Sequence, residues 1–238
     1  MGDAIKVQDL GVMPYLDAWR LQEEAVGQVT AGGGETLFIV EHPAVVTLGR
    51  RDDSVKNLKT SPQNLERLGV ELVNSDRGGD ITFHGPGQIV AYPIIRIAKH
   101  GFSVGGYVHK LEAIVIAALE ELGIQGQTDP EAVGVWVQGN GELEKICAIG
   151  VRIRKGVSLH GLALNAATDL TGFSHIIPCG LSDRGVTSIE KVLGAKSPPI
   201  AEIKSILIRH LTTGLAASVS ARSVPLPSHG SQPDNRPQ

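Results

Sequence analysis

Short apolar runs rich in valine and isoleucine, each ended by glycine or proline, recur along most of this sequence. Examples are TLFIVE at 36–41, IVAYPII at 89–95 and VGVWV at 133–137. Runs of this length and composition predict buried β-strands rather than helices. The chain has 29 glycines but only four Phe, two Trp and three Tyr among 238 residues. The core must therefore be aliphatic, which favours an α/β (α+β) domain with mixed sheets flanked by helices.

Helical periodicity predicts three longer helices. In residues 107–122 apolar side chains recur three and four positions apart, and Gly123 follows as a stop signal. Another helix should follow Pro14, and a last one should cover 198–216. The side chains expected near one face of the helix after Pro14 are Leu16, Trp19, Glu23 and Val26.

The domain organisation follows from composition. No internal repeat or linker-like stretch interrupts the chain between about residue 5 and residue 216, so we expect one catalytic domain over 1–216. Residues 217–238 are rich in Ser and Pro and poor in apolar side chains, and we expect this tail to be disordered.

Charge and cysteine content exclude several classes of protein. With 22 basic and 25 acidic residues the net charge is −3, so neither nucleic acid nor an anionic membrane is expected as a partner. No signal-like segment or run of roughly 18 apolar residues is present, which favours a cytoplasmic protein. Two cysteines are too few for a disulfide framework, and no histidine pair has zinc spacing. We predict no metal and no cofactor.

The glycine-rich segment RGGDITFHGPGQ at 77–88 brings backbone that can approach a ligand closely beside an arginine and a histidine. It would suit the floor of a pocket. A glycine-rich hairpin with a solvated histidine is the alternative, and composition alone slightly favours it. The segment lacks the Gly-Lys-Ser/Thr of a phosphate-binding loop.

The two cysteines differ in context. Cys179 lies between proline and glycine in IIPCGLSD, a turn-like position suited to a nucleophile, although an inert turn residue remains the alternative. Cys147 lies in the apolar run KICAIGV, which is typical of a buried thiol without chemistry. Lys145 opens that run. By default it is a solvated charge at a strand edge, but near a thiol it would stabilise the thiolate and move protons.

Two further segments each allow two interpretations. Arg152, Arg154 and Lys155 form a local basic cluster, which is either solvated surface or a docking site for an acidic protein. The small residues of LHGLALN at 159–165 leave room for a ligand or for a closely packed neighbouring strand, and close packing is the more common case. His160 in this run is compatible with a core histidine.

Four segments together, RGGDITFHGPGQIVAYP, EKICAIGVRI, SLHGLALN and IIPCGL, resemble in this order the lipoyl(octanoyl) transferase family. The resemblance covers about residues 36–192. It implies the fold of the lipoate- and biotin-protein ligases, and a cytoplasmic acyltransferase of protein lipoylation. The implied donor is octanoyl-acyl carrier protein. The implied acceptors are lysines on the lipoyl domains of 2-oxoacid dehydrogenase complexes and on the glycine-cleavage H protein.

The resemblance also implies roles for particular residues. Cys179 would carry the octanoyl group as a thioester, and Lys145 would lower the thiol pKa and move protons, so that the two form a dyad. Small residues at Gly79, Gly150 and Gly161 would open a slot for the acyl chain. The residues implied to contact substrate are Arg77, Gly78, Gly79, Asp80, Ile81, Thr82, Phe83, His84, Ala148, Ile149, Gly150, Gly161, Leu162 and Ala163.

Two other hypotheses remain open at this point. An ATP-dependent lipoate- or biotin-protein ligase would use the same fold without a nucleophilic cysteine. A non-catalytic acyl-protein binding module would never bring Cys179 and Lys145 together.

Overall fold

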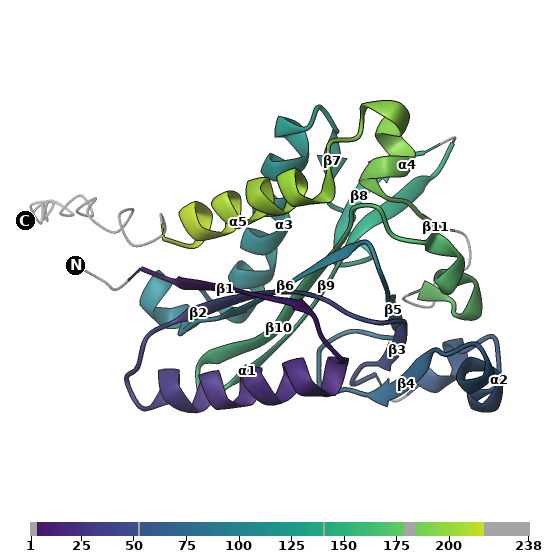
Figure 1. Cartoon of the computed structure of the whole chain (residues 1–238). Helices are drawn as coiled ribbons and strands as arrows, with labels where there is room; N and C mark the ends of the chain where they lie inside the picture. Colours follow the sequence, from purple (N-terminus) through teal and green to yellow (C-terminus); the bar gives the residue numbers. More distant parts are fainter. Residues whose placement is uncertain (1–3, 52, 140, 179–183, 217–238) are drawn as a thin grey trace, which may run out of the picture.

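The computed structural model describes residues 4–51, 53–139, 141–178 and 184–216 (Figure 1). The strands are β1 (Lys6–Val12), β2 (Thr36–Glu41), β3 (Val45–Leu48), β4 (Glu71–Asn74), β5 (Thr82–His84), β6 (Gln88–Ile94), β7 (Gly126–Gln127), β8 (Val135–Gln138), β9 (Leu143–Arg154), β10 (Val157–Asn165) and β11 (Gly185–Val186). The helices are α1 (Tyr15–Thr30), α2 (Pro62–Arg67), α3 (Val104–Glu121), α4 (Ile189–Leu193) and α5 (Ile200–Ala216). Short 3₁₀ turns are η1 (Ser54–Asn57), η2 (Ile97–His100), η3 (Leu170–His175) and η5 (Gly194–Lys196).

The larger of two sheets has the strand order β1-β2-β6-β10-β9-β8-β7, with β11 paired to β9. Consecutive strands from β2 to β7 in this order are antiparallel, and only β1 with β2 and β11 with β9 run parallel. β8 and β9, and β9 and β10, form antiparallel hairpins. The edge strand β1 was not predicted, because its side chains are mostly exposed and give no apolar run.

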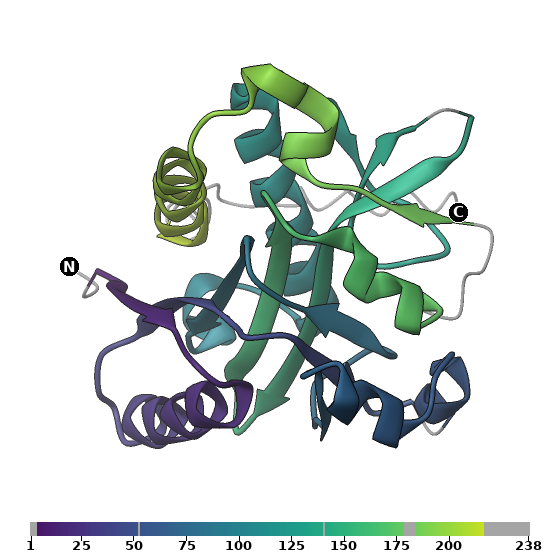
Figure 2. The ribbon, with the colours of Figure 1, turned by 45° about the vertical axis from the view of Figure 1, so that its right-hand side comes forward.

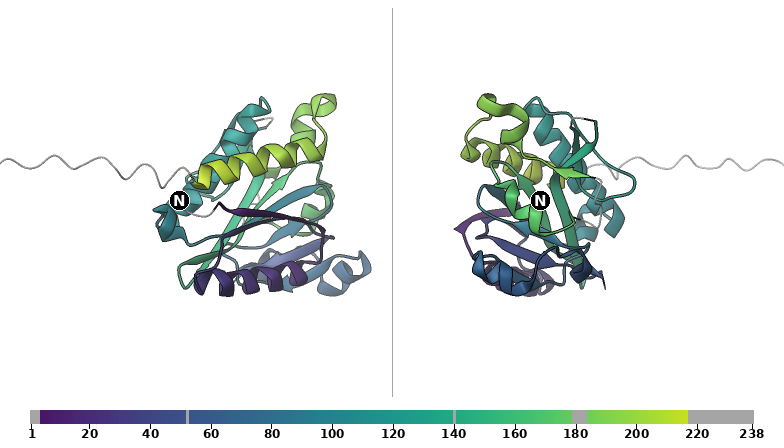
Figure 3. Two further views of the ribbon diagram at one scale, coloured as in Figure 1. Left: turned by 60° about the vertical axis from the view of Figure 1, so that its left-hand side comes forward. Right: turned by 90° about the vertical axis from the view of Figure 1, so that its right-hand side faces the viewer.

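Helices cover both faces of this sheet (Figure 3). Buried leucines, isoleucines and valines of α3 and α5 pack on one face, and α1 packs on the other. The predicted helix at 107–122 is confirmed, but it begins three residues earlier, where the Ser103 hydroxyl accepts a hydrogen bond from the Gly106 N–H at 3.1 Å. Gly123 follows it with φ +77°, as a helix stop requires.

The face predicted for α1 is partly wrong. Val26 is buried and Trp19 is half-buried as expected, but Leu16 is 39% exposed and Glu23 is exposed, and polar residues are buried instead. The hydroxyl of Tyr15 lies 2.7 Å from Ser75 Oγ, and Gln22 Oε1 accepts a hydrogen bond from the His160 N–H at 2.8 Å. These bonds offset the cost of burying the two polar side chains, so the buried stripe of this helix is partly polar.

A smaller sheet of order β4-β3-β5 lies beside the larger one, together with α2 (Figure 2). Its own core is built from β3, β5, α2 and η3, and includes Phe83 and Phe173, whose ring centroids lie 5.4 Å apart. This second core fixes β5, and therefore the glycine-rich loop that precedes β5, against the larger sheet.

Candidate active site

A cavity lies where the loop before β5 meets β9, β10 and η3. Its empty volume is about 700 Å³, open mouth included. All of the predicted substrate-contacting residues except Phe83 line it. The other residues of its wall are Gln88, Val133, Lys145, Asn165, Phe173, Pro178 and Val186. Four of these, Gln88, Lys145, Asn165 and Pro178, lie within the four family motifs quoted above. Their roles toward a substrate remain predictions.

Phe83 is turned away from the cavity because side chains alternate along a strand. Its neighbours Thr82 and His84 line the cavity, while its own ring packs in the core of the smaller sheet. A Cβ at Gly172 would lie 2.2 Å from the Phe83 ring, so this ring is closely packed. The Phe83 ring therefore has a packing role, and its contact with substrate stays a prediction.

Glycines let the 77–80 loop lie directly on β9. The Gly78 N–H donates to the Val151 carbonyl at 3.1 Å, and a Cβ at Gly150 would lie 2.7 Å from the Gly78 oxygen. At Gly161 a Cβ would lie 2.2 Å from the Ala91 oxygen of β6. Gly150 and Gly161 are therefore required by neighbouring backbone, which corrects the expectation that their missing side chains open a slot.

The charged residues of this loop are buried and bonded. Arg77 donates from Nη2 to the Thr47 carbonyl at 2.6 Å and from Nη1 to the Gly78 carbonyl at 3.1 Å. The Asp80 carboxylate accepts from Asn57 Nδ2 at 2.8 Å and from the Ile81 N–H at 2.7 Å. These bonds fix the loop in one conformation.

A hydrogen-bonded chain runs along the cavity wall. His84 Nδ1 lies 2.7 Å from Gln88 Oε1, Gln88 Nε2 donates to Asn165 Oδ1 at 2.8 Å, and Asn165 Nδ2 donates to the Thr187 carbonyl at 2.9 Å. Because the Gln88 oxygen is an acceptor, Nδ1 of His84 carries the proton. Its Nε2 is a buried acceptor without a hydrogen-bond partner among the described residues.

Burial lowers the pKa values of the nearby histidines. Burial, followed by the charges of His42 and Arg77, lowers the pKa of His84 well below its usual range. Burial also lowers the pKa of His42 to about 4. His160 is 1% exposed and bonds to Asp76 Oδ1 at 2.7 Å, so its interpretation as a core histidine is confirmed.

Lys145 of β9 is 6% exposed, so its default interpretation as a solvated edge charge is wrong. Its Nζ donates to the Val133 carbonyl at 3.0 Å. The same Nζ atom lies 4.5 Å from the centroid of the Trp136 ring. Trp136 of β8 is the residue that pairs with Lys145 of β9. A carbonyl and an aromatic face both favour a cation at this position.

The structure describes one of the two cysteines, Cys147. Cys147 is fully buried, and burial raises the pKa of its thiol to about 12, although the Ala163 backbone and Lys145 act in the opposite direction. It is an inert core thiol, as predicted. Cys179 lies outside the described residues. Pro178, which precedes it in the chain, lines the cavity, and so does Val186.

The basic cluster is ion-paired within the chain. Arg152 lies 3.0 Å from Asp76, and Arg154 lies 3.0 Å from Glu23. Two of the three basic residues in the cluster are therefore paired within the chain, and an unpaired basic patch would suit an acidic partner better.

Within the described ranges, no group of three or more His, Cys, Asp or Glu side chains could hold a metal ion. Among the same residues, no helix is both long enough and apolar enough to cross a membrane. The absence of a metal and of a cofactor remains a prediction.

Solved structures first define the class of fold. A bipartite lipoate protein ligase from Thermoplasma acidophilum superposes with a TM-score of 0.65 at 17% identity, covering 89% of this chain and 84% of that one. A biotin protein ligase from Aquifex aeolicus superposes with a TM-score of 0.53 at 16% identity, covering 88% and 70%. The fold is thus the catalytic fold of lipoate- and biotin-protein ligases, as predicted.

Sequence comparison gives the family. The chain belongs to the lipoyl protein ligase A/B catalytic domain family, whose model matches residues 14–212. An octanoyltransferase of Chloroflexus aggregans is 46% identical over 209 residues, which cover 87% of this chain and 93% of that protein. An octanoyltransferase of Rubrobacter xylanophilus is 46% identical over 190 residues, covering 79% and 83%.

Proposed function

We propose that this protein transfers an octanoyl group from octanoyl-acyl carrier protein to a lysine of lipoyl domains, through a thioester on Cys179. The chain is an acyltransferase of protein lipoylation, and the proposal places its reaction in the cytoplasm. The acceptors are lipoyl domains of 2-oxoacid dehydrogenase subunits and the glycine-cleavage H protein. The observation that supports this most strongly is the burial of the Lys145 ammonium in the wall of a cavity that Pro178 also lines.

The first half-reaction moves the acyl group onto the protein. The sulfur of Cys179 attacks the thioester carbonyl of the donor, a new C–S bond forms, and the C–S bond to the carrier breaks. The proton lost by the Cys179 thiol passes through Lys145 to the departing carrier thiolate. One thioester replaces another, so the step needs no ATP.

The second half-reaction forms the amide. The amine of the acceptor lysine attacks the acyl carbon, a C–N bond forms, and the C–S bond to Cys179 breaks. The proton lost by the amine passes through Lys145 to the Cys179 sulfur. The aliphatic side chains of Ile81, Ile149 and Leu162 line the cavity, and they suit an eight-carbon chain.

Intact-mass spectrometry after mixing with octanoyl-acyl carrier protein tests the proposal. The expected result is one added octanoyl group, which disappears when a lipoyl domain is supplied. Cys179→Ser should form no thioester, whereas the matched control Cys147→Ser should still form it because that thiol is buried and inert.

Two results would contradict the proposal. An acyl adduct that persists in Cys179→Ala, which has no side-chain nucleophile at this position, would place the nucleophile elsewhere. Release of AMP from ATP and lipoate, without any adduct, would indicate a ligase instead.

A further inference from the structure

Glu112 is a buried carboxylate of α3 to which the proposed mechanism gives no role. It is 3% exposed, and its Oε1 accepts a hydrogen bond from the Gly134 N–H at 3.0 Å. Its Oε2 lies 3.0 Å from Nδ1 of His109, whose side chain is 80% exposed. Burial of a carboxylate is costly unless it is hydrogen-bonded, so the bond to Gly134 needs an explanation.

The Gly134 N–H belongs to the segment that binds Lys145. In this segment, residues 129–134, the carbonyl of Val133 accepts the hydrogen bond from Lys145 Nζ. The carbonyl of Ala132 accepts one from Trp136 Nε1 at 3.0 Å. The peptide group between Val133 and Gly134 thus joins Glu112 to Lys145, because its N–H bonds to one and its C=O to the other.

This peptide group lies in close contact with β9. Gly134 has φ +131°, and a Cβ there would lie 2.6 Å from the Cys147 oxygen and 3.3 Å from Cε of Lys145. Only glycine fits this conformation and spacing. A displacement of the peptide group would therefore move the ammonium that it binds.

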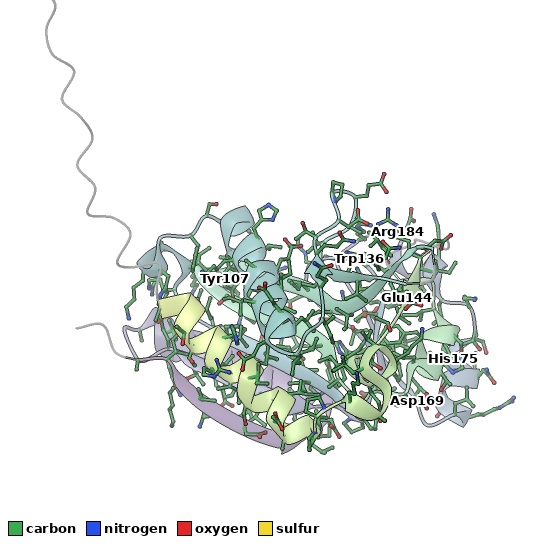
Figure 4. The ribbon with its side chains drawn as sticks, turned by 90° about the horizontal axis from the view of Figure 1, so that it is seen from above. Tyr107, Trp136, Glu144, Asp169, His175 and Arg184 are labelled. Carbon is green, nitrogen blue, oxygen red and sulfur yellow. The ribbon has the colours of Figure 1, made fainter. Side chains whose placement is uncertain are left out.

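The other end of segment 129–134 is bound by Arg184, which forms ion pairs with Asp129 and Glu131. The Arg184 guanidinium also lies 5.3 Å from the Trp136 ring centroid. Figure 4 shows Arg184 and Trp136 close together, away from Tyr107. Both ends of segment 129–134 are therefore bound, and Glu112 stabilises the end that contains the Val133–Gly134 peptide group.

We propose that Glu112 is a positioning residue, which orients the Val133–Gly134 peptide group so that the Val133 carbonyl places the Lys145 ammonium for proton transfer. This inference rests on the proposed function of Lys145. A carboxylate acceptor makes a stronger bond to the Gly134 N–H than a neutral one, which suits it to this task.

Three variants test the proposal. Glu112→Leu removes the acceptor with little change in volume, and it should lower kcat for octanoyl transfer by about 10- to 100-fold with little change in KM for the donor. Glu112→Gln keeps an oxygen that can accept from Gly134, and should stay within about threefold of the wild type. His109→Ala removes the other bond of the same carboxylate and should leave kcat unchanged.

A second measurement follows Lys145 itself. Labelling with acetic anhydride across pH, read by mass spectrometry of the Lys145 peptide, should show a changed pH profile in Glu112→Leu and the wild-type profile in His109→Ala. If Glu112→Leu does not fold, Glu112→Met takes its place, because it also removes the acceptor and its flexible side chain adapts to the site. It should lower kcat and change the labelling profile in the same direction.

The outcomes distinguish this inference from the proposed function. A wild-type protein that forms no acyl adduct contradicts the proposed function. Even then, the labelling profiles of the wild type and of Glu112→Leu show whether Glu112 affects Lys145. An active wild type with unchanged kcat and labelling in Glu112→Leu, or in Glu112→Met, overturns the positioning role. A loss of equal size in His109→Ala overturns it too, because that variant leaves the Gly134 bond in place.

Discussion

Two buried regions of this protein are built on opposite principles. Beneath α3 and α5, the apolar layer consists of aliphatic side chains packed on the larger sheet. Around the cavity, the polar wall of Arg77, His84, Gln88, Lys145 and Asn165 is also buried, yet each of these side chains has a hydrogen-bond partner. Apolar burial stabilises without direction, whereas buried polar groups require fixed geometry. Stability and chemistry should therefore respond to different substitutions.

The largest expected effect is the loss of transfer on changing Lys145 in the polar wall. Lys145→Arg keeps the charge that favours a thiolate but does not release a proton near neutral pH, so octanoyl transfer should fall by about 10²- to 10⁴-fold. Cys179 should still react with iodoacetamide near neutral pH. Lys145→Met should lose both properties, with little loss in the free energy of unfolding because an apolar chain of similar length replaces the ammonium.

Alkylation of Lys145→Met with the wild-type pH profile would show that this lysine does not contact the thiol. The dyad would then be abandoned in favour of another base such as His84. The matched control is again Cys147→Ser.

The converse experiment removes a side chain from the apolar layer. Leu211 of α5 is fully buried, and Leu211→Ala should lower the free energy of unfolding by about 2–5 kcal/mol while kcat stays near the wild-type value below the melting temperature. Urea denaturation and turnover measure the two quantities. Leu16→Ala, on the exposed side of α1, should change stability by less than about 0.5 kcal/mol. Equal losses in both variants would remove the distinction between the buried and exposed faces.

Acid should weaken the protein through its buried histidines. Burial lowers the pKa of His42 to about 4, whereas the ordinary value of an unfolded histidine is about 6.5. Below pH 6.5 the unfolded chain therefore binds a proton that the folded chain does not, and stability falls toward pH 4. We expect the protonation of His42 in the unfolded chain to lower the free energy of unfolding by about 2 kcal/mol between pH 7 and pH 5. His84, whose pKa is also lowered, adds a loss of the same sign.

Urea denaturation at a series of pH values measures this loss, and His42→Gln should show a shallower pH dependence. A stability that stays constant from pH 7 to pH 5 would contradict the assignment of these histidines as neutral in the folded protein.

The smallest effect should come from the tail. Residues 217–238 are poor in apolar side chains, so a chain ending at Ala217 should keep its turnover and lose less than about 0.5 kcal/mol of stability. A clear drop in melting temperature would show that the tail docks on the domain.

The sequence by itself determined the parts of this protein that depend on local periodicity. Apolar repeats predicted the helix around 107–122, and runs of valine and isoleucine predicted the strands on either side of the cavity. The four ordered motifs predicted the family, and the apolar context of Cys147 predicted a buried thiol. Each repeat, each run and each single motif lies within about twenty consecutive residues, and the order of the motifs is also read from the chain, which is why no tertiary information was needed.

Only the tertiary structure decided which polar groups are buried. The bond between Gln22 and the His160 N–H joins residues 138 positions apart, and it adds a polar side chain to the buried face of α1. The bond between Glu112 and Gly134 joins residues 22 positions apart and leads to Lys145. Hydropathy reports apolar burial alone. A polar side chain is buried only where folding brings it a partner, and that partner is set by the packing of distant segments.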